Sequence, residues 1–547
     1  MYEYMNKHKK LPLLIAACLL MTTACTDNFK DINTNPAGVK PDVFLADFKA
    51  LALPLQNAQR SFHHYINWEY QLQRNLNSDI YSGYMMTPTP FNGGNNNSNY
   101  FMMDGWNEWI LNIAYDGVMQ GVADYEKFKP EYEGIDFNDT DALGLVLKVM
   151  EMHKVADIFG PLIYTKYSKP NADLSIDFDS QQNGFKAFFA DLDVAVEKLK
   201  PYVSGTKTVT SAFKNADLIY GGDPEKWLKL ANTLRLRLAL RIVYADATLA
   251  KTEGEKALDP ANGGLLEENA DNALVDYGSE SPIVVIIEDW SDIRTGAPLA
   301  SLLQGYGDPR ITRYMTPASD AAVSGQFIGI RNGVAIDDKS RYSGYSKPIA
   351  SAASANYFDR LKAKAKVMTA AEAWFLKAEA ALRSWANAGE AKINYETGVE
   401  KSFEEWGAGP ATAYLQNSTA TAAPYVDPKS MVANANNVPA GNANLSTITI
   451  QWNPADTDER KLERIITQKW IALYPDGQEA WTEFRRTGYP KLFPVVVNNS
   501  NGTISGFINR LPIPSKFRNS NQGGYTKALT MLDGPDNGGT KVWWDKK

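Results

Sequence analysis

Cysteine is almost absent from this chain of 547 residues, in which Cys18 and Cys25 are the only two. No residue beyond position 25 can therefore form a disulfide, ligate a metal through sulfur or act as a thiol nucleophile. The folded part must be held together by the burial of apolar side chains. A hydrophobic content of 44% provides ample material for such a core.

Histidine is also scarce, with four residues at positions 8, 63, 64 and 153. The neighbours His63 and His64 cannot both face one side of a helix, which disfavours a shared metal site. A catalytic triad would need one of these histidines, and nothing in the sequence marks a nucleophile for it. No nucleophile elbow, phosphate-binding loop or zinc motif stands out either. We therefore expect no catalytic residue, no metal and no cofactor.

Long apolar runs are missing as well, since a membrane-spanning helix needs about 20 apolar residues and no segment supplies them. The N-terminus has the pattern of a secretory signal instead: three lysines at positions 7, 9 and 10 precede the short apolar run 11–21. The following Thr22-Thr23-Ala24-Cys25 resembles a bacterial lipobox, although Thr22 replaces the usual aliphatic residue. We predict that residues 1–24 are a lipoprotein signal peptide, that Cys25 carries the lipid anchor, and that residues 25–40 form a polar tether. The alternative is ordinary secretion, with Cys25 left as a free thiol.

The charge balance disfavours nucleic acid as a partner. The net charge is −7, and removal of the predicted signal, which carries +2, leaves −9. An acidic surface repels phosphate backbones. Aromatic residues are abundant, with 13 Trp and 27 Tyr, so some of them could contact a ligand in addition to building the core.

Three segments show helical periodicity. Asp223 and Pro224 supply a capping carboxylate and a proline at the first helical position, and apolar residues then recur at helical spacing as far as position 243. Thr369 and Glu372 have the spacing of a capping box at the start of a second, alanine-rich helix. The third segment, 456–473, ends at a turn, after which residues 478–486 resume the helical pattern. Such units are compatible with tetratricopeptide-like helix pairs, although no clean repeat of about 34 residues is visible.

Three arginines lie in the first of these helices, at positions 235, 237 and 241. The helix is apolar on two faces, so these side chains must pair with carboxylates or extend to its margins. We predict structural pairing rather than a role in ligand binding.

Long irregular segments separate the helices. Residues 87–99 are rich in Pro, Gly and Asn, and residues 411–456 are rich in Ala, Asn and Thr. Loops of this length in a compact domain are usually functional or disordered. No linker divides the chain into two independent cores. We predict a mostly α fold, with one large helical domain over residues 41–547 that contains tetratricopeptide-like helix pairs and long irregular loops.

Four segments resemble motifs of the SusD/RagB family and occur in the family's order: residues 157–164, 227–237, 368–383 and 468–490. Residues 511–514 add a weaker match, with Phe517 where glutamate is expected. The resemblance implies a helical, SusD-like lipoprotein of the outer membrane that faces the exterior. It also implies that the protein binds an oligomeric nutrient, most simply a glycan, and delivers it to a SusC-like TonB-dependent transporter. We predict that the matching residues themselves build the scaffold rather than the binding site.

The composition best suited to carbohydrate binding lies in the N-terminal third. Aromatic residues flank the asparagine-rich run 92–99, and sugars offer C–H faces for stacking and hydroxyls for amides. A second candidate is Trp290, within Asp289-Trp290-Ser291-Asp292. The alternative is a mobile polar loop with core aromatics beside it. The predicted ligand-binding residues are Tyr81, Tyr84, Phe91, Asn92, Tyr100 and Trp290.

Other functions stay open at this point. A surface glycoside hydrolase would need two carboxylates across the sugar bond, and 63 Asp and Glu residues supply too many pairs to select one. A peptide-binding member of the same family is a further alternative. A two-lobed solute receptor is disfavoured because the strong helices do not alternate with strands. We predict a binding protein and not an enzyme.

Overall fold

The computed structural model describes residues 41–349 and 363–547. The predicted signal peptide, the anchor at Cys25 and the tether therefore lie outside the described residues. The chain divides after Ala50 into two units. The first contains the short helix α3 (Pro41–Leu45) and a 3-10 turn at Ala46–Phe48. The predicted extent of a single domain, 41–547, stays a prediction.

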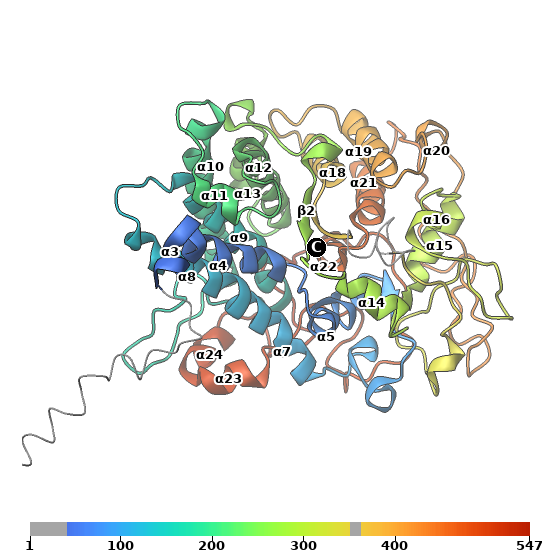
Figure 1. Cartoon of the computed structure of the whole chain (residues 1–547). Coiled ribbons are helices and arrows are strands. Elements are labelled where there is room, and N and C mark those ends of the chain that lie inside the picture. Colours follow the sequence, from blue (N-terminus) through green and yellow to red (C-terminus); the bar gives the residue numbers. More distant parts are fainter. Residues whose placement is uncertain (1–40, 350–362) are drawn as a thin grey trace, which may run out of the picture. The chain divides into compact units, whose positions relative to one another are not determined.

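The second unit is built mainly from helices, as Figure 1 shows. Helix α4 (Lys49–Ser61) begins at the division between the two units. The longer helices are α7 (Asp104–Asn112), α8 (Gln120–Phe128), α9 (Asn138–Phe159), α10 (Gln181–Val203), α12 (Pro224–Arg241), α13 (Ala247–Leu258), α15 (Ala297–Tyr306), α18 (Ala370–Leu382), α19 (Ala391–Glu405), α21 (Asp458–Leu473), α22 (Gly477–Thr487) and α24 (Gln522–Leu529). The shorter ones are α5 (Asn67–Tyr70), α6 (Ser78–Tyr81), α11 (Ser211–Ala216), α14 (Pro282–Glu288), α16 (Ile311–Tyr314), α20 (Thr412–Leu415) and α23 (Ser515–Ser520). None of the described helices is both long and apolar enough to cross a membrane.

The longer helices pack in two neighbouring groups. Helix α10 lies between α9 and α12, and α12 also packs against α13. In the second group α18 packs against α19 and α21, and α21 against α22. Strands β2 (Ala273–Asp276) and β4 (Lys364–Met368) pair antiparallel, and β1 (Met85–Met86) pairs antiparallel with β3 (Arg294–Thr295). The predicted mostly α fold, built from paired helices, is confirmed.

Local capping explains where these helices begin. The Asp223 carboxylate accepts hydrogen bonds from the first backbone N–H groups of α12, and the Thr369 hydroxyl accepts one from α18. Helix α21 begins two residues later than the predicted segment because Thr457 is its N-cap. The predicted turn and the second helix follow, the latter capped by Asp476. Each of these sequence predictions is confirmed.

Arg237 and Arg241 are paired inside the protein, as predicted. Arg237 Nε and Nη2 donate to the two carboxylate oxygens of Glu372 at 2.7 and 2.5 Å. Arg241 Nη1 and Nη2 donate to Glu483 and Glu479 at 2.6 and 2.5 Å. A planar guanidinium can satisfy two acceptors at once, which suits it to buried pairing. The third predicted arginine, Arg235, is also buried and forms ion pairs of its own with carboxylates on α10 and α13.

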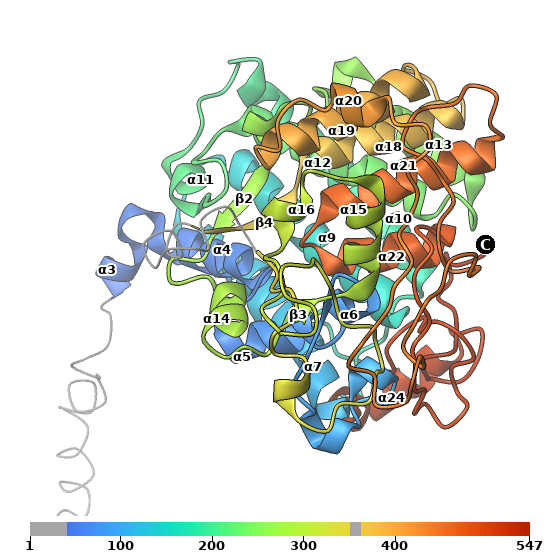
Figure 2. The same ribbon diagram turned by 90° about the vertical axis from the view of Figure 1, so that its right-hand side faces the viewer.

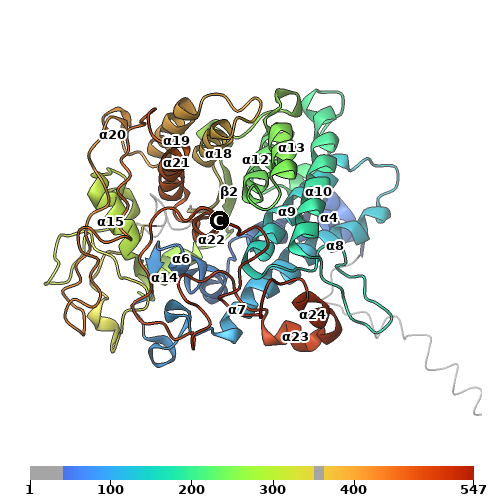
Figure 3. The same ribbon diagram turned by 180° about the vertical axis from the view of Figure 1, so that it is seen from behind.

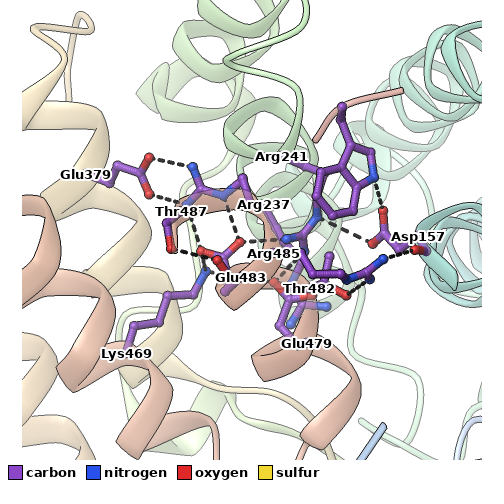
Figure 4. Close-up of polar contacts among 12 residues, drawn as sticks. Asp157, Arg237, Arg241, Glu379, Lys469, Glu479, Thr482, Glu483, Arg485 and Thr487 are labelled. Atoms are coloured by element: carbon purple, nitrogen blue, oxygen red, sulfur yellow. Dashed lines mark hydrogen bonds and ion pairs between the residues drawn. The ribbon is translucent and has the colours of Figure 1, made fainter. Parts of the chain in front are cut away.

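These pairs belong to a buried ionic cluster, most of which is drawn in Figure 4, that ties α9, α12, α18, α21 and α22 together. Its five cationic and five anionic members balance in charge, and a buried charge is tolerable only when it is paired in this way. All members except Arg241 come from the four segments that resemble family motifs, which confirms that those segments build the scaffold. The members are Asp157, Arg237, Arg241, Glu372, Glu379, Lys469, Glu479, Glu483, Arg485 and Arg486.

Candidate functional site

The pairing of β1 with β3 brings two loops together that are distant in sequence. The asparagine-rich loop starts directly after β1, and the segment that contains Trp290 ends directly before β3. The hydroxyl of Thr89 donates a hydrogen bond to Asp292 Oδ1 at 2.6 Å, which joins the two segments. The two candidate binding segments predicted separately from the sequence therefore lie in one region of the molecule.

A pocket of about 190 Å³ opens in this region. Its walls come from segments 86–99, 333–336 and 497–499, and Figure 2 shows the blue segment after β1 near the yellow segment around residue 340. Hydroxyls and amides beside aliphatic groups can bind the polar edge and the C–H face of a small ligand. The polar lining residues include Thr87, Thr89, Asn95, Asn96, Ser98, Asn99 and Asn499, and the aliphatic ones are Val334, Ile336 and Val497.

The asparagines of the loop mostly fix its conformation. Asn97 is 0% exposed, and its amide nitrogen donates to Leu76 O at 3.0 Å and to Asn107 Oδ1 at 2.9 Å. Asn96 and Asn99 form a reciprocal capping box around the short turn Asn97–Asn99. A loop whose buried amides are satisfied in this way presents its remaining side chains in a defined arrangement.

Three of the predicted ligand-binding residues lie in the core. Tyr81, Tyr84 and Tyr100 are 5%, 0% and 6% exposed. The Tyr84 hydroxyl donates to the backbone oxygen of Trp470, and the Tyr81 ring packs against Trp481 with their ring centroids 5.1 Å apart. Side chains with so little exposed surface cannot stack on a ligand, so these three tyrosines are part of the core and do not bind the ligand directly.

The other three predicted residues are at least partly exposed. Asn92 is exposed, while Phe91 and Trp290 are half-buried. Phe91 meets Trp106 edge to face, with their ring centroids 5.6 Å apart. Trp290 packs against the hydrophobic core and presents the remainder of its ring to solvent. Phe91, Asn92 and Trp290 are therefore placed where a ligand could reach them.

Two further residues near the candidate segments, Lys339 and Arg341, could not be predicted because no sequence motif marks them. Lys339 Nζ donates to Asp292 Oδ1 and to the backbone oxygen of Trp290, both at 2.7 Å. Arg341 forms an ion pair with Asp337 at 2.6 Å, and this guanidinium holds the pKa of the Asp337 carboxyl well below its usual value. Each of these two cations is thus neutralised by a carboxylate partner, which favours a neutral ligand over a polyanion.

Histidines and carboxylates form no metal centre in the part of the chain that the structure describes. No group of three or more His, Cys, Asp or Glu side chains there is arranged to hold a metal ion. His63 is buried, and burial lowers its pKa well below the usual value. Its neighbour His64 stacks on Tyr65 and lies 3.2 Å from Glu69.

Comparisons with known proteins identify the relatives of this chain. The family model described as SusD-like, Susd and RagB outer membrane lipoprotein, matches residues 31–545. A chitin-binding SusD homologue from Flavobacterium johnsoniae is 40% identical, with a TM-score of 0.82 over 90% of this chain and 98% of its own. A SusD homologue from Bacteroides vulgatus is 35% identical, with a TM-score of 0.82 over 91% and 98%. A SusD-like protein from Bacteroides thetaiotaomicron is 31% identical, with a TM-score of 0.80 over 91% and 99%. No curated protein sequence matches the chain.

Proposed function

Since the chain belongs to the SusD-like family of outer membrane lipoproteins, we propose that it binds an oligosaccharide and delivers it to a SusC-like TonB-dependent transporter. In this proposal the lipid on Cys25 anchors the protein in the outer membrane, facing the exterior. The protein captures its ligand without cleaving it.

One observation carries the binding part of the proposal. Phe91, Asn92 and Trp290, which composition alone marks as suited to sugars, are at least partly exposed and come from two segments that the β1–β3 pairing and the Thr89–Asp292 hydrogen bond bring together. The segment that carries Phe91 and Asn92 also lines a pocket with mixed polar and aliphatic walls. Partly exposed rings provide stacking surfaces, and exposed amides provide hydrogen bonds to hydroxyls. Capture by such an open surface gives modest affinity, because much of the gain offsets ordering and desolvation. Modest affinity suits a subunit that must release its ligand to a transporter.

The chemistry of the pocket favours a neutral ligand that carries amide groups. Asparagine side chains can pair with the N–H and C=O of an acetamido substituent, and the aliphatic wall can contact its methyl group. The relative from Flavobacterium johnsoniae is described as chitin-binding. Oligomers of N-acetylglucosamine are therefore the first ligands to test.

Titration calorimetry of the purified domain with such oligomers tests the proposal. We expect binding by the wild type and a loss of roughly 10-fold in affinity for Phe91→Ala and for Trp290→Ala, because each substitution removes a stacking surface. Trp452→Ala is the matched control, since Trp452 is also a half-buried ring packed against the same core but comes from neither of the two candidate segments. Circular dichroism must stay unchanged in all variants.

Two outcomes would contradict the proposal. If Phe91→Ala and Trp290→Ala both bind like the wild type while the control is intact, these two aromatic residues do not form the binding site. If the purified domain releases reducing sugar from these oligomers, and a single Asp or Glu substitution abolishes that release, the protein is a hydrolase rather than a carrier.

A further inference from the structure

A second pocket, of about 440 Å³, shares no residue with the first. Its walls come from the long irregular segment between positions 421 and 447, from Glu463 on α21 and from Lys491. Most of its lining side chains are small: alanine, glycine, serine and threonine. Glu463 and Lys491 are the charged residues among those that line it. The chemistry of this pocket therefore depends on one carboxylate and one ammonium group.

Hydrogen bonds hold the irregular segment of this pocket in one arrangement. The backbone N–H of Ala422 donates to Ser446 O at 3.3 Å, which joins two walls of the pocket. The backbone N–H of Ala423 donates to Ser301 O on α15 at 3.0 Å, and the Ser301 hydroxyl donates back to Ala423 O. Composition alone marks this segment as functional or disordered, and these bonds fix it against a helix. A pocket with fixed walls loses less free energy to ordering when a ligand binds.

Glu463 is buried in this pocket with few partners. It is 7% exposed, and its carboxylate accepts one hydrogen bond, from the Ser446 hydroxyl at 2.9 Å, and forms no ion pair with the described residues. Asp427, 4% exposed and also without an ion pair there, accepts hydrogen bonds from the hydroxyls of Tyr342 and Tyr345 and from an asparagine amide. Burial of a carboxylate is costly unless other groups replace its hydration. Glu463 lacks such groups within the described protein, and it lines a pocket in which a ligand can supply them.

Lys491 supplies a positive charge to the same pocket. It is exposed, and its ammonium group lies 5.6 Å from the centroid of the Tyr489 ring. Lys547 contacts the same ring at 4.9 Å but pairs with Glu459. Lys491 has no such carboxylate among the described residues, and it forms no ion pair with Glu463. The two charges are therefore available to groups of opposite sign on one ligand.

We infer that this second pocket binds a small zwitterion, namely an α-amino acid, and thus a ligand of a different class from the oligosaccharide. The ammonium group of the ligand donates to Glu463, and its carboxylate pairs with Lys491. The hydroxyls of Ser446 and Thr447 provide further hydrogen bonds. Charge-assisted hydrogen bonds at both ends are stronger than bonds between neutral groups. A neutral sugar would leave the buried carboxylate without a cation.

The test measures the binding of L-alanine to the purified domain by calorimetry or ligand-observed NMR. Ethylamine and propionate, which each keep one of its two charged groups, should bind roughly 10-fold more weakly or worse. Glu463→Gln and Lys491→Met should each lower the affinity for L-alanine by roughly 10-fold, because each removes one charge and nearly conserves the size of the side chain. Lys186→Met is the matched control, since Lys186 is also an exposed lysine without an ion pair among the described residues but lies outside the pocket.

The outcomes are independent of the proposed function, because the two pockets share no residue. Selective loss of L-alanine binding in both variants, with unchanged circular dichroism and unchanged affinity for the N-acetylglucosamine oligomers, supports the inference. The inference is wrong if L-alanine does not bind, or if ethylamine or propionate binds as tightly as L-alanine. It is also wrong if Lys491→Met, which alters an exposed side chain and should not disturb folding, binds L-alanine like the wild type. A protein that binds L-alanine but no oligosaccharide would contradict the proposed function alone.

Discussion

At the scale of single residues, Glu379 on α18 shows how a residue of a family motif stabilises the fold through ion pairs with arginines. Both of its carboxylate oxygens accept hydrogen bonds from Arg486, at 2.7 and 2.6 Å, and one also accepts from Arg383 Nε at 3.0 Å. Burial opposes ionisation of Glu379, but the two guanidinium groups outweigh it and lower its pKa to about 2. The ionised form is therefore part of the folded state.

We predict that Glu379→Gln destabilises the protein in a pH-dependent way. The folded pKa lies below the ordinary value of 4.5. The contribution of the carboxylate is thus fully present above pH 4.5 and is lost as the pH falls toward 2. At pH 7 the substitution should lower the free energy of unfolding by about 3 kcal/mol or more, because it also leaves buried arginines without their charge partner. Urea unfolding at pH 7 and pH 3 measures the difference, which should shrink at pH 3.

The control for this prediction is Glu225→Gln. Its side chain is 59% exposed and pairs with Lys229 across one helical turn. An exposed pair of this kind contributes less than about 1 kcal/mol. Equal effects of the two substitutions, or an effect of Glu379→Gln that is the same at both pH values, would contradict the role assigned to the buried cluster.

The ligand-binding residues could be predicted only in part, because the sequence does not show which aromatic side chains are buried. Phe91, Asn92 and Trp290 could be selected from composition, and their side chains are exposed or half-buried. Tyr84 was selected by the same argument, yet its ring packs against Trp470 with centroids 4.7 Å apart. Composition shows which side chains could stack on a sugar. Whether such a side chain is exposed depends on the residues that pack against it in the fold. For Tyr84 this partner is Trp470, which lies 386 residues away in sequence and accepts the hydrogen bond of the Tyr84 hydroxyl.

At the scale of elements, helices were predictable because their signals are local. The caps Asp223 and Thr369 are encoded within a few residues of the helices that they start, and apolar periodicity supplies the rest. The long loops lack such signals. In the asparagine-rich loop, the order comes from amides such as that of Asn97, whose partners Leu76 and Asn107 lie outside the loop.

We predict that Asn97→Ala weakens ligand binding without touching the ligand. Asn97 does not line the pocket, but its side chain bonds Leu76 O, Asn107 Oδ1 and the backbone N–H of Met103. Its loss leaves those groups unsatisfied at a cost of about 1–3 kcal/mol and loosens the loop. Hydrogen exchange of the backbone amides of residues 91–100 should accelerate, and affinity for the oligosaccharide should fall. Unchanged exchange rates in Asn97→Ala would show that this amide does not order the loop.

At the scale of the whole molecule, the pocket could not be assembled from the sequence. Its walls combine segments 86–99, 333–336 and 497–499. More than two hundred residues separate the first segment from the second, and about one hundred and sixty separate the second from the third. The last two segments carry neither a motif nor an unusual composition. The backbone N–H of Asn499 donates to Asn99 O at 2.7 Å, and that of Val497 donates to Gly333 O at 3.0 Å. Only the complete fold brings these segments together.

In the proposed function the molecule is attached to the membrane through its N-terminus. None of the described helices can cross a membrane, and the family is one of outer membrane lipoproteins. We predict that Cys25→Ala yields a folded protein that is absent from the membrane fraction and is not labelled by a fatty-acid analogue in growing cells, because no other cysteine follows the predicted signal. Cys18→Ala is the matched control, since it removes the only other cysteine, inside the signal, and should leave both labelling and membrane location unchanged. Label on the Cys25→Ala protein, or its retention in the membrane fraction, would place the anchor elsewhere.

A single lipid chain binds a membrane only marginally, whereas the several chains of a lipoprotein hold the protein there stably. We therefore expect such an anchor to keep the whole domain at the membrane, as the proposed delivery of its ligand to a transporter requires.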